Sequence, residues 1–148
     1  DLSAAPSPMP TVKGKSATQA FIAANPQIDA VWSDSGLQAM GAIEAFTEAG
    51  RPVPPITGED LNGFLRKAKE NNVDFFAVQY PPEIGLRVVE LAVKILSGEP
   101  VPRYVNVPAK SFDKSEVDKY YMPDYNDDLW VINEFPPAWI DKMGFKKK

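Results

Sequence analysis

The sequence of 148 residues contains no cysteine and no histidine. Without cysteine the chain cannot form a disulfide, a zinc-thiolate site, an iron–sulfur cluster or a thiolate nucleophile. Without histidine it lacks the base of a Ser-His-Asp triad and the commonest metal-ligating side chain. Carboxylates, Lys, Tyr and Ser remain as reactive groups, so we expect a binding role, with no metal and no cofactor.

Long apolar runs and an excess of positive charge are also missing. No stretch approaches the roughly 18 apolar residues of a membrane span. The 16 Lys and Arg residues are outnumbered by 20 Asp and Glu residues, and this acidic balance argues against a nucleic-acid partner. Residues 1–10 show neither the basic start nor the apolar stretch of a signal peptide, so we expect any targeting information to lie upstream.

Proline is abundant, with 15 residues that separate segments of helical and strand pattern. Apolar residues at helical spacing predict helices over residues 14–25, 37–49, 61–71 and 82–97. Short apolar runs predict strands over residues 28–33, 55–58, 74–79 and 104–107. This alternation predicts the α/β class, with a doubly wound parallel sheet and helices on both of its faces.

The ends of the chain depart from this alternation. We predict an irregular amino-terminal segment over residues 1–13, an α/β lobe over 14–110 and a carboxyl-terminal extension over 111–148. In the extension we expect a short helix within 111–121, extended chain to about Pro136, and a further helical turn that docks through Trp139 and Ile140.

Polar side chains follow three of the predicted strands, where ligands bind in open parallel sheets. They are Asp34 and Ser35, Glu59 and Asp60, and Gln79 and Tyr80. Carboxylates accept hydroxyl hydrogens and an amide both donates and accepts, a set that suits the diols of a sugar. Trp32, Phe76 and Tyr80 can offer a flat surface to a sugar ring, although the places of Trp32 and Phe76 inside strands favour the core.

Several of these polar residues have a purely structural alternative. Ser35 with Gln38 has the spacing of a capping box, and Asp34 suits a turn. Asp60 precedes a predicted helix and can be its N-cap. Gln79 has no evident capping duty, which favours ligand contact.

Four blocks, in this order, carry a family resemblance. They are Asn-Pro-Gln-Ile-Asp-Ala-Val-Trp at 25–32, Gln-Ala-Met-Gly-Ala-Ile-Glu-Ala at 38–45, Gly-Glu-Asp at 58–60 and Val-Gln-Tyr-Pro-Pro-Glu-Ile-Gly at 78–85. The chain resembles, over residues 14–128, the carboxyl-terminal half of the type I periplasmic sugar-binding proteins of ABC importers, of the ribose-binding kind.

The resemblance implies two α/β lobes that close over a sugar and present it to a membrane permease, in the periplasm or anchored outside the cell. By position, Asp60 matches a family Asp that accepts sugar hydroxyls, Gln79 matches a Gln near the hinge, and Ser35 takes a place often held by Asn. After about residue 80 the chain is expected to cross to the other lobe. Most of that lobe is absent, so we expect helix 82–97 to expose its apolar face and to pair with a missing amino-terminal lobe or a second copy.

Two other functions stay open at this stage. The same architecture occurs in the effector-binding domain of lac-repressor-type regulators. A glycoside hydrolase would instead use Glu59 with Asp60 or Asp34 as an acid and base pair. Adjacent residues rarely face one bond from opposite sides, which disfavours the enzyme.

Overall fold

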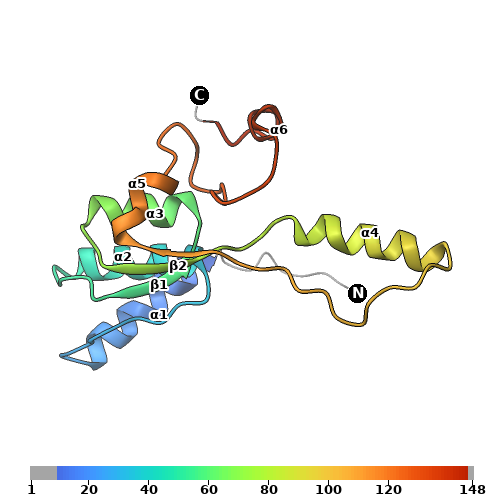
Figure 1. Ribbon diagram of the computed structural model, residues 1–148. Helices are drawn as coiled ribbons and strands as arrows, with labels where there is room; N and C mark the ends of the chain where they lie inside the picture. The colour runs from blue at the N-terminus through green and yellow to red at the C-terminus, as the bar shows by residue number, and fades with distance from the viewer. Residues whose placement is uncertain (1–9, 147–148) are drawn as a thin grey trace, which may run out of the picture.

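The computed structural model describes residues 10–146. Its elements are α1 (Pro10–Ala24), α2 (Gly36–Glu48), β1 (Ile56–Glu59), α3 (Asn62–Glu70), β2 (Phe75–Val78), α4 (Ile84–Leu96), β3 (Ser111–Asp113), a 3-10 helix (Lys114–Glu116), α5 (Val117–Tyr120) and α6 (Pro137–Lys142) (Figure 1). From α2 to α4 the helices alternate with strands, which confirms the α/β class. No helix within residues 10–146 combines the length and the apolar character needed to cross a bilayer.

The first helix begins earlier than the apolar pattern indicated. α1 starts at Pro10 rather than Gly14, so residues 10–13 of the expected irregular segment are helical, and residues 1–9 lie outside the described part. Proline is favoured in the first helical turn because its missing N–H would have no partner there.

The sheet is mixed rather than wholly parallel. β1 and β2 run parallel, with Ile56 opposite Phe75, whereas β3 is antiparallel to β2, with Ala77 opposite Phe112. The predicted strand at 104–107 does not form, and β3 lies where a helix was expected to begin. The chain returns from α4 in extended form and enters the sheet against the direction of β2.

The predicted strand at 28–33 forms a single bridge to β1. Val31 donates to the Pro55 carbonyl at 2.9 Å, and Thr57 donates to the Val31 carbonyl at 3.1 Å. Within the described chain, Ala30 and Trp32 have no backbone partner on the outer side of this segment. One bridge falls short of the consecutive residue pairs that make up a regular strand.

The hydrophobic core lies between the sheet and the helices α2 and α3. Phe64 of α3 meets Phe75 edge-on at 5.4 Å between ring centroids, and Phe75 meets Phe112 at 6.1 Å. On the opposite face of the sheet Phe76 is 48% exposed and Val78 is similarly open. The prediction that Phe76 lies in the core is therefore wrong: β2 buries alternate residues on one face only.

Helix α1 packs on α2 through two glycines. A Cβ atom on Gly41 would overlap the Thr11 carbonyl oxygen, and one on Gly14 would lie 2.7 Å from the Gln38 carbonyl oxygen. The two backbones therefore touch where neither residue has a side chain.

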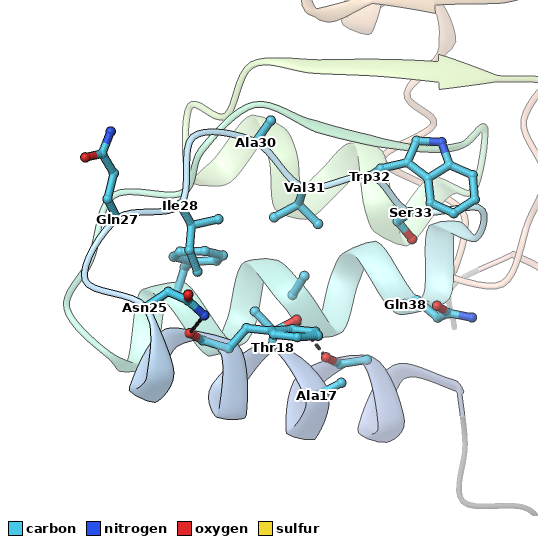
Figure 2. A pocket seen from close by; sticks show the side chains of 14 residues that line it. Ala17, Thr18, Asn25, Gln27, Ile28, Ala30, Val31, Trp32, Ser33 and Gln38 are labelled. Atoms are coloured by element: carbon cyan, nitrogen blue, oxygen red, sulfur yellow. Dashed lines mark hydrogen bonds between the residues drawn. The ribbon is translucent and has the colours of Figure 1, made fainter.

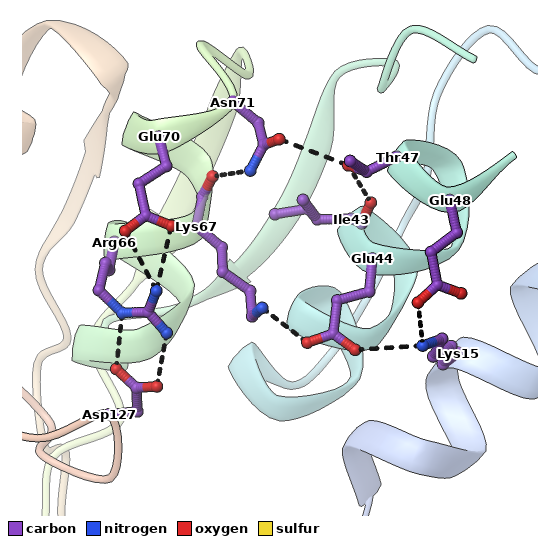
Figure 3. Close-up of polar contacts among 10 residues, drawn as sticks. All are labelled: Lys15, Ile43, Glu44, Thr47, Glu48, Arg66, Lys67, Glu70, Asn71 and Asp127. Carbon is purple, nitrogen blue, oxygen red and sulfur yellow. Dashed lines mark hydrogen bonds and ion pairs between the residues drawn. The ribbon is translucent and has the colours of Figure 1, made fainter. Parts of the chain in front are cut away.

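Charged side chains link the helices at the surface (Figure 3). Glu44 of α2 pairs with Lys67 of α3 at 2.6 Å and with Lys15 of α1 at 3.8 Å. Arg66 of α3 forms a two-pronged contact with Asp127, at 2.9 and 2.6 Å. Single exposed pairs add little stability, so these contacts chiefly fix which neighbours the helices meet.

Helix α4 stands apart from the lobe on two extended connections (Figure 1). None of its residues is buried, and Leu96 is 87% exposed. The exposed apolar side chains are Ile84, Leu86, Val88, Val89, Val93, Ile95 and Leu96. The prediction of an uncovered apolar face is confirmed for the described chain.

The carboxyl-terminal extension packs back on the lobe. Leu129, Val131 and Ile132 are buried, and α6 buries Ile140. Trp139 is 63% exposed, so the expectation that Trp139 and Ile140 both dock is confirmed for Ile140 and wrong for Trp139. Consecutive helical residues point about 100° apart, so a short helix rarely buries both.

Candidate functional site

The predicted strand ends do meet at one edge of the lobe. The Thr57 hydroxyl donates to the Ser33 carbonyl at 2.8 Å and accepts from the Ser33 N–H, which holds segment 28–33 beside β1. Asp60 donates through its N–H to the Val78 carbonyl at 3.1 Å, which places the end of β1 beside the end of β2.

A groove of about 410 Å³ opens at this edge. Its walls are Trp32, Ser33, Asp34, Thr57, Gly58, Glu59, Phe76, Val78 and Gln79. Three residues at the strand ends, Asp34, Glu59 and Gln79, thus come together, whereas Ser35, Asp60 and Tyr80 do not line the groove. Trp32 is 80% exposed, so the prediction that it lies in the core is wrong and its ring is free to meet a ligand.

Glu59 caps the helix that Ser35 was expected to cap. Ser35 occupies the N-cap position of α2 but forms no side-chain cap bond, so the prediction of a capping box formed by Ser35 and Gln38 is wrong. Instead the Glu59 carboxylate accepts from the Gly36 N–H at 3.2 Å. Burial raises the pKa of Glu59, the Gly36 N–H opposes this shift, and the charge of Asp34 adds to it.

Asp60 is fully buried beneath the site. One carboxylate oxygen accepts from the Tyr80 N–H at 2.7 Å and the other from the Ile132 N–H at 2.8 Å. Leu61, not Asp60, is the N-cap of α3, so the capping alternative for Asp60 is wrong. Burial raises the pKa of Asp60 to about 6, against the effect of the two N–H donors. Its contact with a sugar hydroxyl stays a prediction.

Gln79 bridges two other parts of the chain. Its side-chain nitrogen donates to the Ile132 carbonyl at 3.1 Å, and its side-chain oxygen accepts from the Lys110 N–H at 3.1 Å. Tyr80 next to it is half exposed, with its ring 5.5 Å from that of Trp130. Ligand contact by both residues stays a prediction.

Asn62 is a key residue that the sequence analysis missed. Its buried amide nitrogen donates to the carbonyls of Met122, Tyr125 and Asn126 at 2.8 to 3.0 Å. Its oxygen accepts from the Met122 N–H at 3.0 Å. Its partners lie about sixty positions away in the sequence, so no local signal separates it from an exposed Asn at a helix start.

A second pocket of about 450 Å³ lies between α1, segment 25–33 and α2 (Figure 2). Apolar side chains such as Phe21, Val31 and Phe46 form much of its wall. Arg51 closes the turn beside it by donating to the Asn25 and Pro26 carbonyls at 3.0 Å. Sequence analysis gave no sign of this pocket, because three separate segments build it.

The site offers acceptors and an aromatic surface rather than a reactive pair. Glu59 turns toward α2 and Asp60 toward Tyr80 and Ile132, so this pair of the hydrolase alternative does not face a common space. The other pair, Glu59 and Asp34, lines the same groove, with the Glu59 carboxylate bonded to the Gly36 N–H. Within residues 10–146 no group of three or more acidic side chains is placed to hold a metal ion. Hydrogen bonding to a small polar ligand is the chemistry that this arrangement supports.

Comparison with known proteins places the chain among binding proteins. The family described as "Periplasmic binding protein domain" matches residues 11–100. The ribose import binding protein RbsB of Salmonella typhimurium is 32% identical over 101 residues, which are 68% of this chain and 34% of that protein. RbsB of Bacillus subtilis is 28% identical over 98 residues, 66% of this chain and 32% of that protein. The chain thus spans about a third of the length of these relatives.

Solved structures agree with the fold. A Mycobacterium smegmatis protein in complex with beta-D-fucofuranose superposes with a TM-score of 0.67 at 27% identity, over 74% of this chain and 37% of that one. The arabinose-binding component of an ABC transporter from Shewanella shares the fold, with a TM-score of 0.66 at 21% identity over 74% of this chain and 38% of that one. With more than half of its residues matched by the family, the chain belongs to the periplasmic binding protein domain family.

Proposed function

We propose that this chain forms part of a sugar-binding protein that captures a monosaccharide and delivers it to the permease of an ABC importer. The single observation that carries the proposal is the groove at the strand ends, where Asp34, Glu59 and Gln79 meet beside exposed Trp32. Carboxylates and an amide next to an aromatic ring are the groups that a sugar's hydroxyls and apolar ring face require. The relatives, which include ribose import proteins, support this ligand class.

We assign the direct contacts with sugar in the groove to Asp34 and Gln79, with Trp32 as a stacking surface. Ser35 and Tyr80, which do not line the groove, stay predicted contacts. Asp60 lies behind them, and the second lone pair on each of its oxygens is the acceptor for any hydroxyl that reaches it. The groove is open on one side, so a second lobe would complete the site by closing over the ligand. The location that follows for the working protein is the periplasm or the outer side of the membrane.

Replacing Asp34 by Ala should weaken sugar binding roughly 5- to 150-fold, because a sugar hydroxyl loses an acceptor whose removal costs about 1 to 3 kcal/mol. Saturation-transfer NMR on the 148-residue chain, with D-ribose, D-allose, L-arabinose and D-fucose, measures this effect even at millimolar affinity. Asp29→Ala is the matched control, because Asp29 lies on the same segment, contacts Gln27 and is not part of the groove. Equal affinity in the Asp34 variant and the unchanged chain, or no sugar binding by the chain, would contradict the proposal.

The exposed apolar face of α4 suits a chain that associates with a second lobe or with a second copy of itself. Arg87, Glu90 and Lys94 form its one charged stripe, and the rest of the helix surface is largely apolar. We propose that a second lobe covers this helix and that, in its absence, a second copy of the chain does so.

Introducing Glu at Val89 and Val93 should shift the 148-residue chain toward the monomer, because the charges interrupt the apolar face on which association depends. Sedimentation velocity measures the shift, and binding of an apolar dye should fall in parallel. Lys94→Glu is the control on the charged stripe and should leave association within about twofold of the unchanged chain. A chain that is monomeric at 16.3 kDa and binds no dye before any substitution would refute the idea.

A further inference from the structure

Segment 28–33 is the outer edge of the sheet. Val31 bonds to β1 through both of its backbone groups, at 2.9 and 3.1 Å. Neighbouring residues of a strand point their backbone groups to opposite sides, so Ala30 and Trp32 direct theirs away from β1. Within residues 10–146 neither has a backbone partner on that side. An edge with unpaired N–H and C=O groups is a template for a further strand.

The pocket of about 450 Å³ between α1, segment 25–33 and α2 lies along this edge, and we call it the edge pocket. Figure 2 shows Val31 pointing toward the two helices and Ala30 pointing away from them. Phe21 of α1 and Phe46 of α2 line the pocket, and Phe21 is 62% exposed. Unpaired backbone groups beside an apolar pocket are the two features that strand addition uses, the first for affinity and the second for specificity.

Polar side chains in the wall of the edge pocket are already bonded within the chain. The Thr18 hydroxyl donates to the Gly14 carbonyl at 2.8 Å, and the Asn25 amide donates to the Phe21 carbonyl at 2.9 Å. The Ser33 hydroxyl donates to the carbonyl of the nearby N-cap residue of α2 at 2.9 Å. Since these donors are used, the pocket suits apolar side chains better than a polar ligand.

A second copy of the chain does not suit this edge. Two copies paired through segment 28–33 would bring both α1 helices beneath the joint, because α1 forms one wall of the edge pocket in each copy. Paired strands stand about 4.8 Å apart, whereas packed helices need about 8 to 10 Å. An occupant that adds a strand, with no helix of its own on this side, avoids the conflict.

The rest of the protein can supply such a strand. The chain spans about a third of the length of the RbsB proteins, so most of a protein of that kind lies outside these 148 residues. Segment 28–33 and β1 are parallel and are joined through α2. Helical crossovers join parallel strands, so a strand that precedes α1 and lies at this edge runs parallel to segment 28–33 as well.

We propose that the outer edge of segment 28–33 takes up one further strand from the part of the protein outside these 148 residues. The added strand runs parallel to the segment and places alternate branched apolar side chains in the edge pocket. This contact needs no bound sugar and does not involve α4, so it goes beyond the proposed function.

The parallel direction decides which residues of the added strand pair. In parallel neighbours, residues that point to the same face also turn their N–H and C=O groups to the same side. Val31 faces the helices and bonds to β1, so residues of the added strand that face the edge pocket bond to Ala30 and Trp32. In an antiparallel strand the residues facing the pocket would turn their backbone groups away from the segment.

Amide NMR of the 148-residue chain, with the capped octapeptide Lys-Thr-Val-Thr-Val-Thr-Val-Lys at millimolar concentration, tests the edge. We expect hydrogen exchange at Ala30 and Trp32 to become at least about threefold slower, the factor for about two-thirds occupancy. The Val31 amide, already bonded to the Pro55 carbonyl, should slow by less. Unchanged exchange at Ala30 and Trp32, or peptide-induced shifts confined to α4, would overturn the proposal.

Two peptides methylated on backbone nitrogen separate strand pairing from loose apolar contact. Methylation of the Val residues removes the donors that are expected to face the segment and should abolish the slowing. Methylation of the Thr residues leaves those donors in place and should preserve it. The opposite result would mean an antiparallel strand, and equal effects of the two peptides would mean contact without pairing; either result contradicts the proposal.

Ala30→Pro tests the same edge from the side of the chain. Proline removes the outward N–H of residue 30 and is tolerated in edge strands where that N–H faces solvent. The bonds of Val31 to β1 are untouched, so the variant should fold and lose the slowing at Trp32, whereas the control Ala30→Val should keep it. If Ala30→Pro does not fold, the methylated peptides still decide. Equal slowing at Trp32 in the two folded variants would place the peptide elsewhere and refute the pairing.

The chain without peptide gives one more test. Protection of Ala30 and Trp32 that rises with protein concentration would assign the edge to a second copy and overturn the proposal. Fast exchange at both amides over the whole concentration range is the result expected for an edge that is free in this chain. Because no sugar is present in these experiments, their failure leaves the sugar proposal untouched.

Discussion

The Gly41→Ala substitution is expected to lower the free energy of unfolding by about 2 to 3 kcal/mol, through overpacking between two helices. A methyl group on Gly41 would overlap the Thr11 carbonyl oxygen and lie 2.7 Å from the Lys15 nitrogen. Both atoms belong to the backbone of α1, so they cannot turn away as a side chain would. Relief requires α1 to move off α2, which opens the contact at Gly14 as well.

Urea unfolding followed by circular dichroism measures this loss, and Gly85→Ala is the matched control. Both glycines lie in helices of similar length, but nothing lies within 4 Å of a Cβ atom on Gly85. Alanine exceeds glycine in helix propensity by about 1 kcal/mol, so Gly85→Ala should leave stability unchanged or raise it. A gain in stability for Gly41→Ala would show that α1 does not pack closely on α2.

The helices were the part of the fold that the sequence predicted best. The apolar spacing around α2 predicted residues 37–49, and the helix spans Gly36–Glu48. This pattern is local, because every residue that sets it lies within a few turns of the next. Strands depend on distant partners: segment 28–33 has suitable side chains but only β1 beside it, and residues 104–107 have no strand beside them in the described chain.

The prediction that Trp32 and Phe76 are buried was wrong for a related reason. Trp32 and Phe76 have the side chains of buried strand residues, yet both face a side of the sheet that the described chain leaves open. A strand's own composition does not report whether a second layer covers it. Because this side of the sheet is open, Trp32 lines the groove, where we propose that its ring stacks on the sugar.

The positions of the candidate site were easier to predict than the roles of its residues. The rule that ligands bind at strand ends brought Asp34, Glu59 and Gln79 to one groove. It did not show that Glu59 would cap α2 or that Asp60 would hold Ile132, 72 residues further along. Such contacts join segments that only the folded chain brings together.

Asn62 shows how much can depend on a residue without a sequence signal. Its buried amide satisfies three carbonyl groups of the segment from Met122 to Asn126 and one N–H of the same segment. The backbone N–H of Asn62 also donates to the Leu129 carbonyl at 2.8 Å. One side chain thus anchors the start of the extension to the end of the lobe that carries the groove.

Replacing Asn62 by Ala should therefore lower the free energy of unfolding by about 3 to 4 kcal/mol, because each buried polar group left unsatisfied costs about 1 to 3 kcal/mol and water can reach some of them. Urea unfolding measures the loss, and proteolysis should cut between residues 121 and 132 at least tenfold faster. Asn71→Ala is the control, since the exposed Asn71 amide only donates to the Lys67 carbonyl and accepts from the Thr47 hydroxyl at 3.4 Å, and the substitution should cost less than about 1 kcal/mol. Equal losses in the two variants would mean that the extension is held by its apolar residues, and that the Asn62 contacts add nothing to its anchoring.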